Sequence, residues 1–103
     1  MYSRVTLLEI DTMRINVGDA VELFEAEVLP RMRDEKGFEG VLALATPEGK
    51  GMLVSFWDTQ EQAEDASGFA TGELERFVAL FRAPPGRECY QVVHRELPQA
   101  ALS

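Results

Sequence analysis

The single histidine, His94, is the first residue to consider for chemistry, because histidine alone titrates near neutral pH without help from its surroundings. The extended pattern from Glu88 to Leu97 predicts a last strand, in which His94 and Tyr90 face the same way. On a face that binds a ligand, His94 would act as a general base. Tyr90 would position the ligand or donate to a developing oxyanion. A hydrogen-bonded structural histidine is the alternative.

Four further polar or aromatic residues are candidate ligand contacts. Trp57 is the only tryptophan and ends the run 50–57, with Ser55 on the same side of the predicted strand. Its indole would stack on an aromatic ligand and donate one orienting hydrogen bond, while Ser55 would add a hydroxyl. Packing in the core is the alternative role for Trp57. Arg4 and Thr6 share one face of the first predicted strand and are plausible polar contacts.

The remaining reactive groups do not form a recognisable site. Glu61, Glu64 and Asp65 cluster at helical spacing, but acidic side chains at the start of a helix are favoured by the helix dipole. We interpret them as capping residues and predict no metal. Cys89 is the only cysteine, so no intramolecular disulfide forms, and strand parity places it on the face opposite His94.

Composition limits the classes of partner. The chain has 103 residues, of which 46% are hydrophobic, and this predicts one domain spanning 1–103. A net charge of −8 repels phosphate backbones and anionic lipid, so neither nucleic acid nor membrane is an expected partner. No signal peptide or transmembrane run is visible. Together with the single cysteine, this predicts a cytoplasmic protein.

Strand and helix patterns alternate along the chain. The segment from Asn16 to Asp19 offers capping side chains to a first helix, which Pro30 should bend or end. Asp58, with Glu61 three residues later, predicts the start of a second helix. The clearest amphipathic pattern runs from Leu74 to Phe81. Strand patterns cover residues 4–11, 41–45, 50–57 and 88–97, which gives the order β-α-β-β-α-β.

The strands 41–45 and 50–57 are apolar on both faces. A sheet with helices on only one face should alternate between apolar and polar residues. The second face therefore needs a cover, because large exposed apolar patches mark interaction surfaces. We predict a homodimer through the sheet faces, which would form a barrel with the helices outside.

Three motifs resemble the antibiotic biosynthesis monooxygenase domain family of the dimeric α+β barrel superfamily. They are Asn16-Val17-Gly18, Gly37-Phe38-Glu39-Gly40-Val41 and Phe56-Trp57-Asp58-Thr59-Gln60-Glu61-Gln62-Ala63. The resemblance extends from about Val5 to Leu97 and implies an α+β, ferredoxin-like antiparallel sheet that dimerises into a barrel. It also implies oxidation of a small phenol- or quinol-type aromatic compound by dioxygen without a cofactor. His94 would then deprotonate the substrate.

The chain departs from that family at functional positions. The strand-one position that the resemblance pairs with an asparagine holds Thr6, and the only asparagine is Asn16. Haem-degrading relatives need a histidine and a tryptophan on the second helix, and neither occurs from Thr59 to Ala83, which excludes haem degradation. Two alternatives remain open. One is a non-catalytic ligand-binding or stress-response barrel, and the other is an isomerase or lyase that uses His94 without oxygen.

Overall fold

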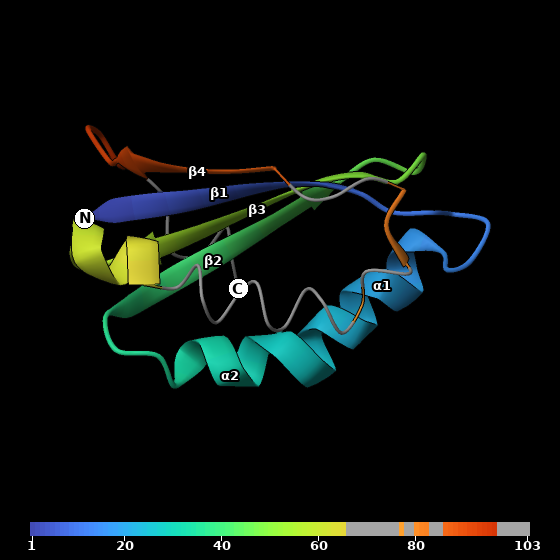
Figure 1. Cartoon of the computed structure of the whole chain (residues 1–103), viewed down its shortest axis with the longest axis horizontal. Coiled ribbons are helices and arrows are strands. Elements are labelled where there is room, and N and C mark those ends of the chain that lie inside the picture. The colour runs from blue at the N-terminus through green and yellow to red at the C-terminus, as the bar shows by residue number, and fades with distance from the viewer. Residues whose placement is uncertain (66–76, 78–79, 83–85, 97–103) are drawn as a thin grey trace.

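The computed structural model describes residues 1–65, 77, 80–82 and 86–96. Its strands form one antiparallel sheet in the order β2-β3-β1-β4, and Figure 1 shows α1 and α2 together on one side of that sheet. This is the α+β, ferredoxin-like arrangement predicted from the sequence. The elements are β1 (Tyr2–Glu9), α1 (Val17–Leu23), η1 (Phe24–Val28), α2 (Leu29–Arg33), β2 (Phe38–Ala45), β3 (Lys50–Trp57) and β4 (Gly86–Gln91).

Strand pairing assigns each side chain to one of two faces. In β1, Arg4 lies directly opposite Ser55 of β3 and Cys89 of β4, so these three residues share a face. We call it the inner face, because its Trp57 packs against Ala63 of the helical segment 60–65. The other face is the outer face. Its residues include Val5, Leu7, Leu42, Leu44, Met52, Val54, Phe56 and Tyr90.

The first helix changes its winding immediately before Pro30. Asn16 caps its start, because the Asn16 Oδ1 atom accepts a hydrogen bond from the Asp19 backbone N–H (2.7 Å). The π-helical segment η1 follows, and the Leu29 N–H bonds to the Phe24 carbonyl five residues earlier. Proline lacks an N–H and crowds the carbonyl four residues before it, which explains this wide turn. The helix then continues as α2 to Arg33, so Pro30 interrupts the regular winding without ending the helix.

The second helix begins one residue later than predicted. The Gln62 N–H donates to Thr59 Oγ1 (3.2 Å), and the Thr59 N–H donates to Gln62 Oε1 (3.1 Å), which is a reciprocal capping box. Thr59 rather than Asp58 is therefore the cap. Asp58 still belongs to the end of the sheet, where its backbone N–H donates to the Gly37 carbonyl (2.9 Å). Most of the predicted amphipathic segment from Leu74 to Phe81 lies outside the described residues.

The last strand is shorter than predicted, and this affects His94. β4 spans Gly86–Gln91 rather than 88–97 and pairs only with β1. Its ladder ends where β1 begins, and the last bond runs from the Val92 N–H to the Met1 carbonyl (3.0 Å). His94 lies beyond that point and is exposed. Assigning it to the face of Tyr90 by strand parity is therefore wrong.

Apolar side chains remain accessible on the outer face. Leu7 and Leu44 are each 53% exposed, although each lies within an apolar stretch of its strand. Tyr90 on the neighbouring β4 is 49% exposed. The two-sided apolar pattern of β2 and β3 thus corresponds to one face that packs against helices and one that no described residue covers.

Candidate functional site

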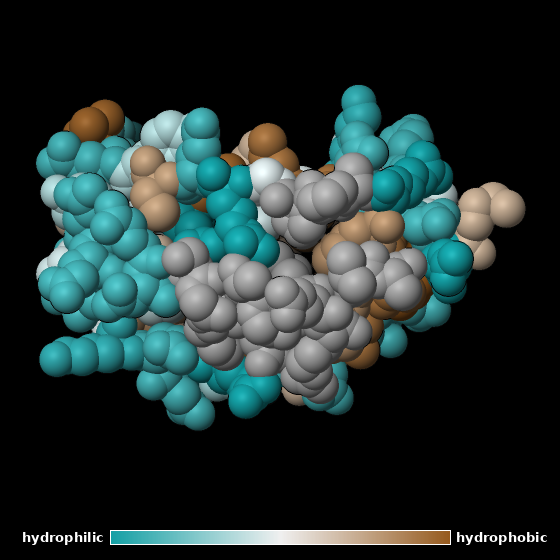
Figure 2. All heavy atoms as spheres, viewed as in Figure 1, coloured by the Kyte–Doolittle hydropathy of each residue, from teal (hydrophilic) through white to brown (hydrophobic). Residues whose placement is uncertain are grey.

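An apolar cavity of about 120 Å³ lies between the inner face and the first helix. Figure 2 shows hydrophobic residues (brown) gathered near α1, where this cavity lies. Every described residue of its lining is apolar, so none of them carries a charged side chain. The lining consists of Leu8, Ile10, Ile15, Ala20, Val21, Leu23, Phe24, Val28, Ala43, Leu44, Ala45, Gly51, Met52, Leu53, Phe77, Leu80 and Phe81.

The segment 80–82 is fastened to the end of β1 and supplies part of the cavity wall. Ile10 and Phe81 form an antiparallel bridge. The Asp11 N–H donates to the Leu80 carbonyl (2.7 Å), and the Arg82 N–H donates to the Glu9 carbonyl (2.8 Å). These backbone bonds hold Leu80 and Phe81 against the cavity from a distant part of the sequence.

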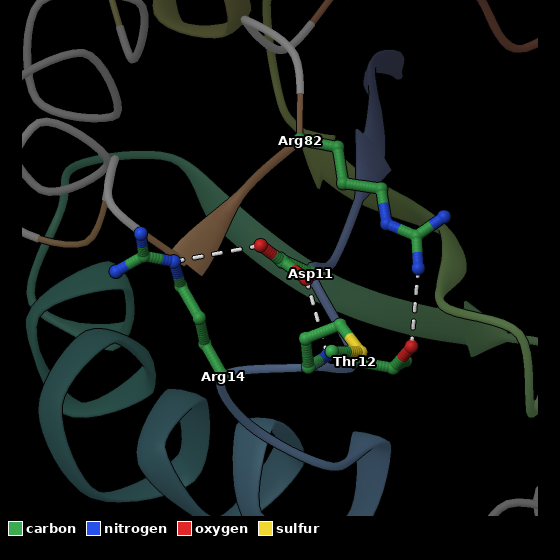
Figure 3. Close-up of polar contacts among 5 residues, drawn as sticks. Asp11, Thr12, Arg14 and Arg82 are labelled. Carbon is green, nitrogen blue, oxygen red and sulfur yellow. Dashed lines mark hydrogen bonds and ion pairs between the residues drawn. The ribbon is translucent and has the colours of Figure 1, made fainter.

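Side chains reinforce this junction, as Figure 3 shows. Arg82 Nη2 donates to Thr12 Oγ1 (3.2 Å), and the Arg14 Nε atom lies 3.4 Å from Asp11 Oδ2. The other oxygen of Asp11, Oδ1, accepts from the Met13 backbone N–H (3.1 Å). Because exposed ion pairs contribute little stability, the main role of these contacts is to order the loop after β1.

Trp57 and Ser55 already bond to each other on the inner face. Trp57 is 1% exposed, and its indole Nε1–H donates to Ser55 Oγ (2.9 Å). The Ser55 hydroxyl in turn donates to the Arg4 carbonyl (3.4 Å). Phe38 meets the Trp57 ring edge-on at a centroid distance of 5.6 Å. In this conformation Trp57 performs the core-packing role, and its N–H is not available to a ligand.

Among the described residues, Arg4 is the one whose buried side chain has unused hydrogen-bond donors. Its side chain is 4% exposed, and Nε and Nη2 have no hydrogen-bond partner. Burial lowers the pKa of the Arg4 guanidinium, the charge of Arg87 lowers this pKa further, and Cys89 raises it. Thr6 follows on the inner face and is 3% exposed. Arg4 and Thr6 therefore present buried polar groups on the face that carries the cavity, although neither of them lines it.

Tyr90 and His94 do not belong to this group of inner-face residues. Tyr90 is on the outer face, and its hydroxyl donates to the Glu88 carboxylate. This hydrogen bond is the main reason why the pKa of Tyr90 lies above its ordinary value. Neither Tyr90 nor the exposed His94 lines the cavity. The structure thus brings Arg4, Thr6, Ser55 and Trp57 together and separates them from Tyr90.

The cavity itself was not predicted from the sequence. Its wall combines Ile15 from the loop after β1, Phe24 from η1 and Phe81 from a segment far along the chain. One signal was present in the sequence: Leu8 and Ile10 share the strand parity of Arg4 and Thr6, so that face changes from polar to apolar along the strand.

No metal-binding cluster occurs within residues 1–65, 77, 80–82 and 86–96, because no three His, Cys, Asp or Glu residues there are grouped to hold an ion. Across the same ranges, no helix combines the length and apolar character needed to cross a membrane.

Comparison with known proteins identifies the fold. No family model matches the chain, and no curated protein matches it. A protein of unknown function from Nitrosomonas europaea, NE2512, is 24% identical over 94% of this chain and 93% of its own, with a TM-score of 0.67. The monooxygenase from the gene ActVA-Orf6 of Streptomyces coelicolor, solved with the ligand nanaomycin D, is 18% identical over 95% and 92%, with a TM-score of 0.69.

A Deinococcus radiodurans protein named as a candidate antibiotic biosynthesis monooxygenase is also similar, with 12% identity over 96% of this chain and 99% of its own and a TM-score of 0.72. Similarity at these identities establishes a shared fold. The chain therefore has the fold of the antibiotic biosynthesis monooxygenases, as its sequence motifs implied.

Proposed function

We propose that this protein is a cofactor-independent oxygenase that acts on a small aromatic compound of the phenol or quinol class. The cavity is the observation that supports this function most strongly. It lies between the sheet and the first helix, is partly open, and its described lining is apolar, as in most sites for aromatic rings. Its volume is about 120 Å³, and an engineered apolar cavity of about 150 Å³ takes up benzene. A single ring therefore suits this cavity.

The proposed reaction needs no external reductant. A phenol loses its proton, the electron-rich phenolate reduces dioxygen, one oxygen atom enters the ring, and the other leaves as water. The substrate supplies all four electrons that reduce dioxygen, so a phenol becomes a quinone and a quinol becomes a hydroxyquinone. Among the described residues that line the cavity, none is titratable, so we propose that the base reaches the substrate from outside this lining. We assign this role to His94, with Thr6, Ser55, Arg4 and the ring of Trp57 as further ligand contacts to be tested. Tyr90, on the outer face, would contact a ligand on that side of the sheet.

We also propose that the whole chain, residues 1–103, forms one domain that works in the cytoplasm as a homodimer. The accessible outer face, with Leu7 and Leu44 half-exposed, supports a second copy as its cover. The single cysteine, Cys89, supports a reducing compartment.

Oxygen consumption tests the enzymatic role. Purified protein is mixed with a panel of alkylated hydroquinones in an oxygen electrode, and quinone is followed by absorbance. We expect uptake above the background rate of autoxidation, and we expect His94→Ala to reduce it by about a hundredfold or more. Arg95→Ala, at the neighbouring exposed position, is the matched control and should retain full activity. Unchanged activity in His94→Ala excludes His94 as the base.

A non-catalytic ligand-binding protein is the second candidate, and the apolar character of the described lining residues favours it. Such a protein would bind the quinols and leave the rate of oxygen uptake at background. Calorimetric titration beside the oxygen electrode separates the two candidates, because only the oxygenase consumes its ligand.

A further inference from the structure

Arg4 is a buried cation whose donors lack acceptors. Its side chain is 96% buried, and two of its three guanidinium nitrogens, Nε and Nη2, make no hydrogen bond. Arginine stays protonated at neutral pH, so these are charged N–H groups held away from water. A buried unpaired charge is costly and is usually retained only where something compensates it.

A second cation lies close by on the same face. Arg87 of β4 is directly opposite Thr6 of β1, one inner-face position from Arg4. The positive charge of Arg87 repels that of Arg4 and so lowers the pKa of Arg4. A negative group beside Arg4 would accept from the unused donors and relieve this repulsion. Among the described residues, no carboxylate occupies this position as a partner of Nε or Nη2.

The cavity and Arg4 lie on the same face of the same strand. Arg4, Thr6, Leu8 and Ile10 are successive inner-face residues of the first strand and its end, and Leu8 and Ile10 line the cavity. The Cα atoms of Arg4 and Leu8 are about 13 Å apart at the usual rise of a strand. The arginine side chain spans part of that distance, so a ligand that reaches both needs a short spacer between its ring and its acidic group.

We propose that the guanidinium of Arg4 binds the carboxylate of a small aromatic acid whose ring occupies the apolar cavity. This inference takes the aromatic character of the ligand from the proposed function and adds the acidic group and the residue that recognises it. Thr6 lies between the two parts of the site and adds a hydroxyl next to the spacer. A carboxylate suits the fork of N–H donors on arginine better than a neutral amide does, because the hydrogen bonds are then charge-assisted.

Binding of matched acids and amides tests the proposal. The probes are benzoate, phenylacetate, 3-phenylpropanoate and 4-phenylbutanoate, each paired with its primary amide, and binding is measured by calorimetry. We expect at least one acid to bind roughly tenfold to a hundredfold more tightly than its amide. Arg4→Met should reduce this ratio to about one. Arg14→Met removes the same charge at a position 62% exposed and should leave the ratio unchanged.

A second measurement needs no variant. The Nε–H resonance of Arg4 in a ¹⁵N NMR spectrum should shift when the preferred acid binds and stay in place when its amide is added. The proposal is overturned if no acid is preferred over its amide, if the preference survives Arg4→Met, or if acetate alone binds as tightly as the preferred acid. Binding is measured without dioxygen turnover, so acid binding without oxidation overturns the proposed function and leaves this inference standing.

Discussion

Replacing Arg4 by methionine should stabilise the ligand-free protein. Methionine keeps an unbranched, flexible side chain of similar reach and removes the charge, so it fills the same space without unused donors. Leaving a buried donor unsatisfied costs about 1–3 kcal/mol, and exchanging buried charges for apolar groups has stabilised other proteins by about 1–4 kcal/mol. We therefore expect the free energy of unfolding to rise by about 1–3 kcal/mol. For a domain of this size, each kcal/mol corresponds to about 4–8 °C in Tm.

The pH dependence of this gain follows from the pKa of Arg4. Burial lowers this pKa in the folded protein, so the folded state disfavours the charged form. The penalty is complete below the folded pKa and disappears only as the pH rises through that value towards the ordinary pKa of arginine. The difference in the free energy of unfolding between Arg4→Met and the wild type should therefore be constant between about pH 6 and pH 9.

Urea denaturation followed by far-UV circular dichroism measures the effect, with no ligand present. Arg14→Met is the control, because Arg14 is largely exposed and its replacement should change the free energy of unfolding by less than about 0.5 kcal/mol. A loss of more than about 1 kcal/mol in Arg4→Met would refute the reasoning, because it would mean that the guanidinium has stabilising partners in the folded protein.

Three further changes test separate parts of the structure. Asn16→Ala removes the cap of α1 and should lower the free energy of unfolding by about 1 kcal/mol in urea denaturation; no loss would mean that the cap does not contribute. Leu7→Lys places a charge on the outer face and should convert the proposed dimer to a monomer in native mass spectrometry, whereas Met13→Lys, on an exposed loop, should not. A dimer that persists in Leu7→Lys contradicts the proposed interface. Glu88→Gln removes the charged acceptor of Tyr90 and should lower the pKa of that phenol towards 10.0 in an absorbance titration; an unchanged pKa would mean that the bond is absent in solution.

The order of the elements and the faces of the central strands were predictable from the sequence, because both depend on local alternation. Arg4, Thr6, Ser55 and Trp57 were expected on the strands that now place them together. Their common face depends on the register between β1 and β3, which no single strand pattern contains.

The errors lie where the structure depends on a partner segment. The strand pattern of residues 88–97 continues past Gln91, but a strand persists only where a neighbour supplies hydrogen bonds, and β1 ends first. The prediction that His94 shares a face with Tyr90 depended on that pattern. Within the part of the pattern that does form a strand, parity holds: Cys89 lies on the inner face, opposite that of Tyr90, and its thiol donates to the Ala63 carbonyl (3.8 Å). The cavity was not predictable either, since its wall combines elements distant in sequence.

Isotope labelling of the product with ¹⁸O₂ tests the proposed oxygenation most directly. Protein and the best quinol or phenol substrate are incubated under ¹⁸O₂, and the quinone is analysed by mass spectrometry before its oxygen exchanges with water. The account predicts one ¹⁸O atom per molecule of product and no product under argon. An unlabelled product, or turnover that continues without oxygen, would contradict it.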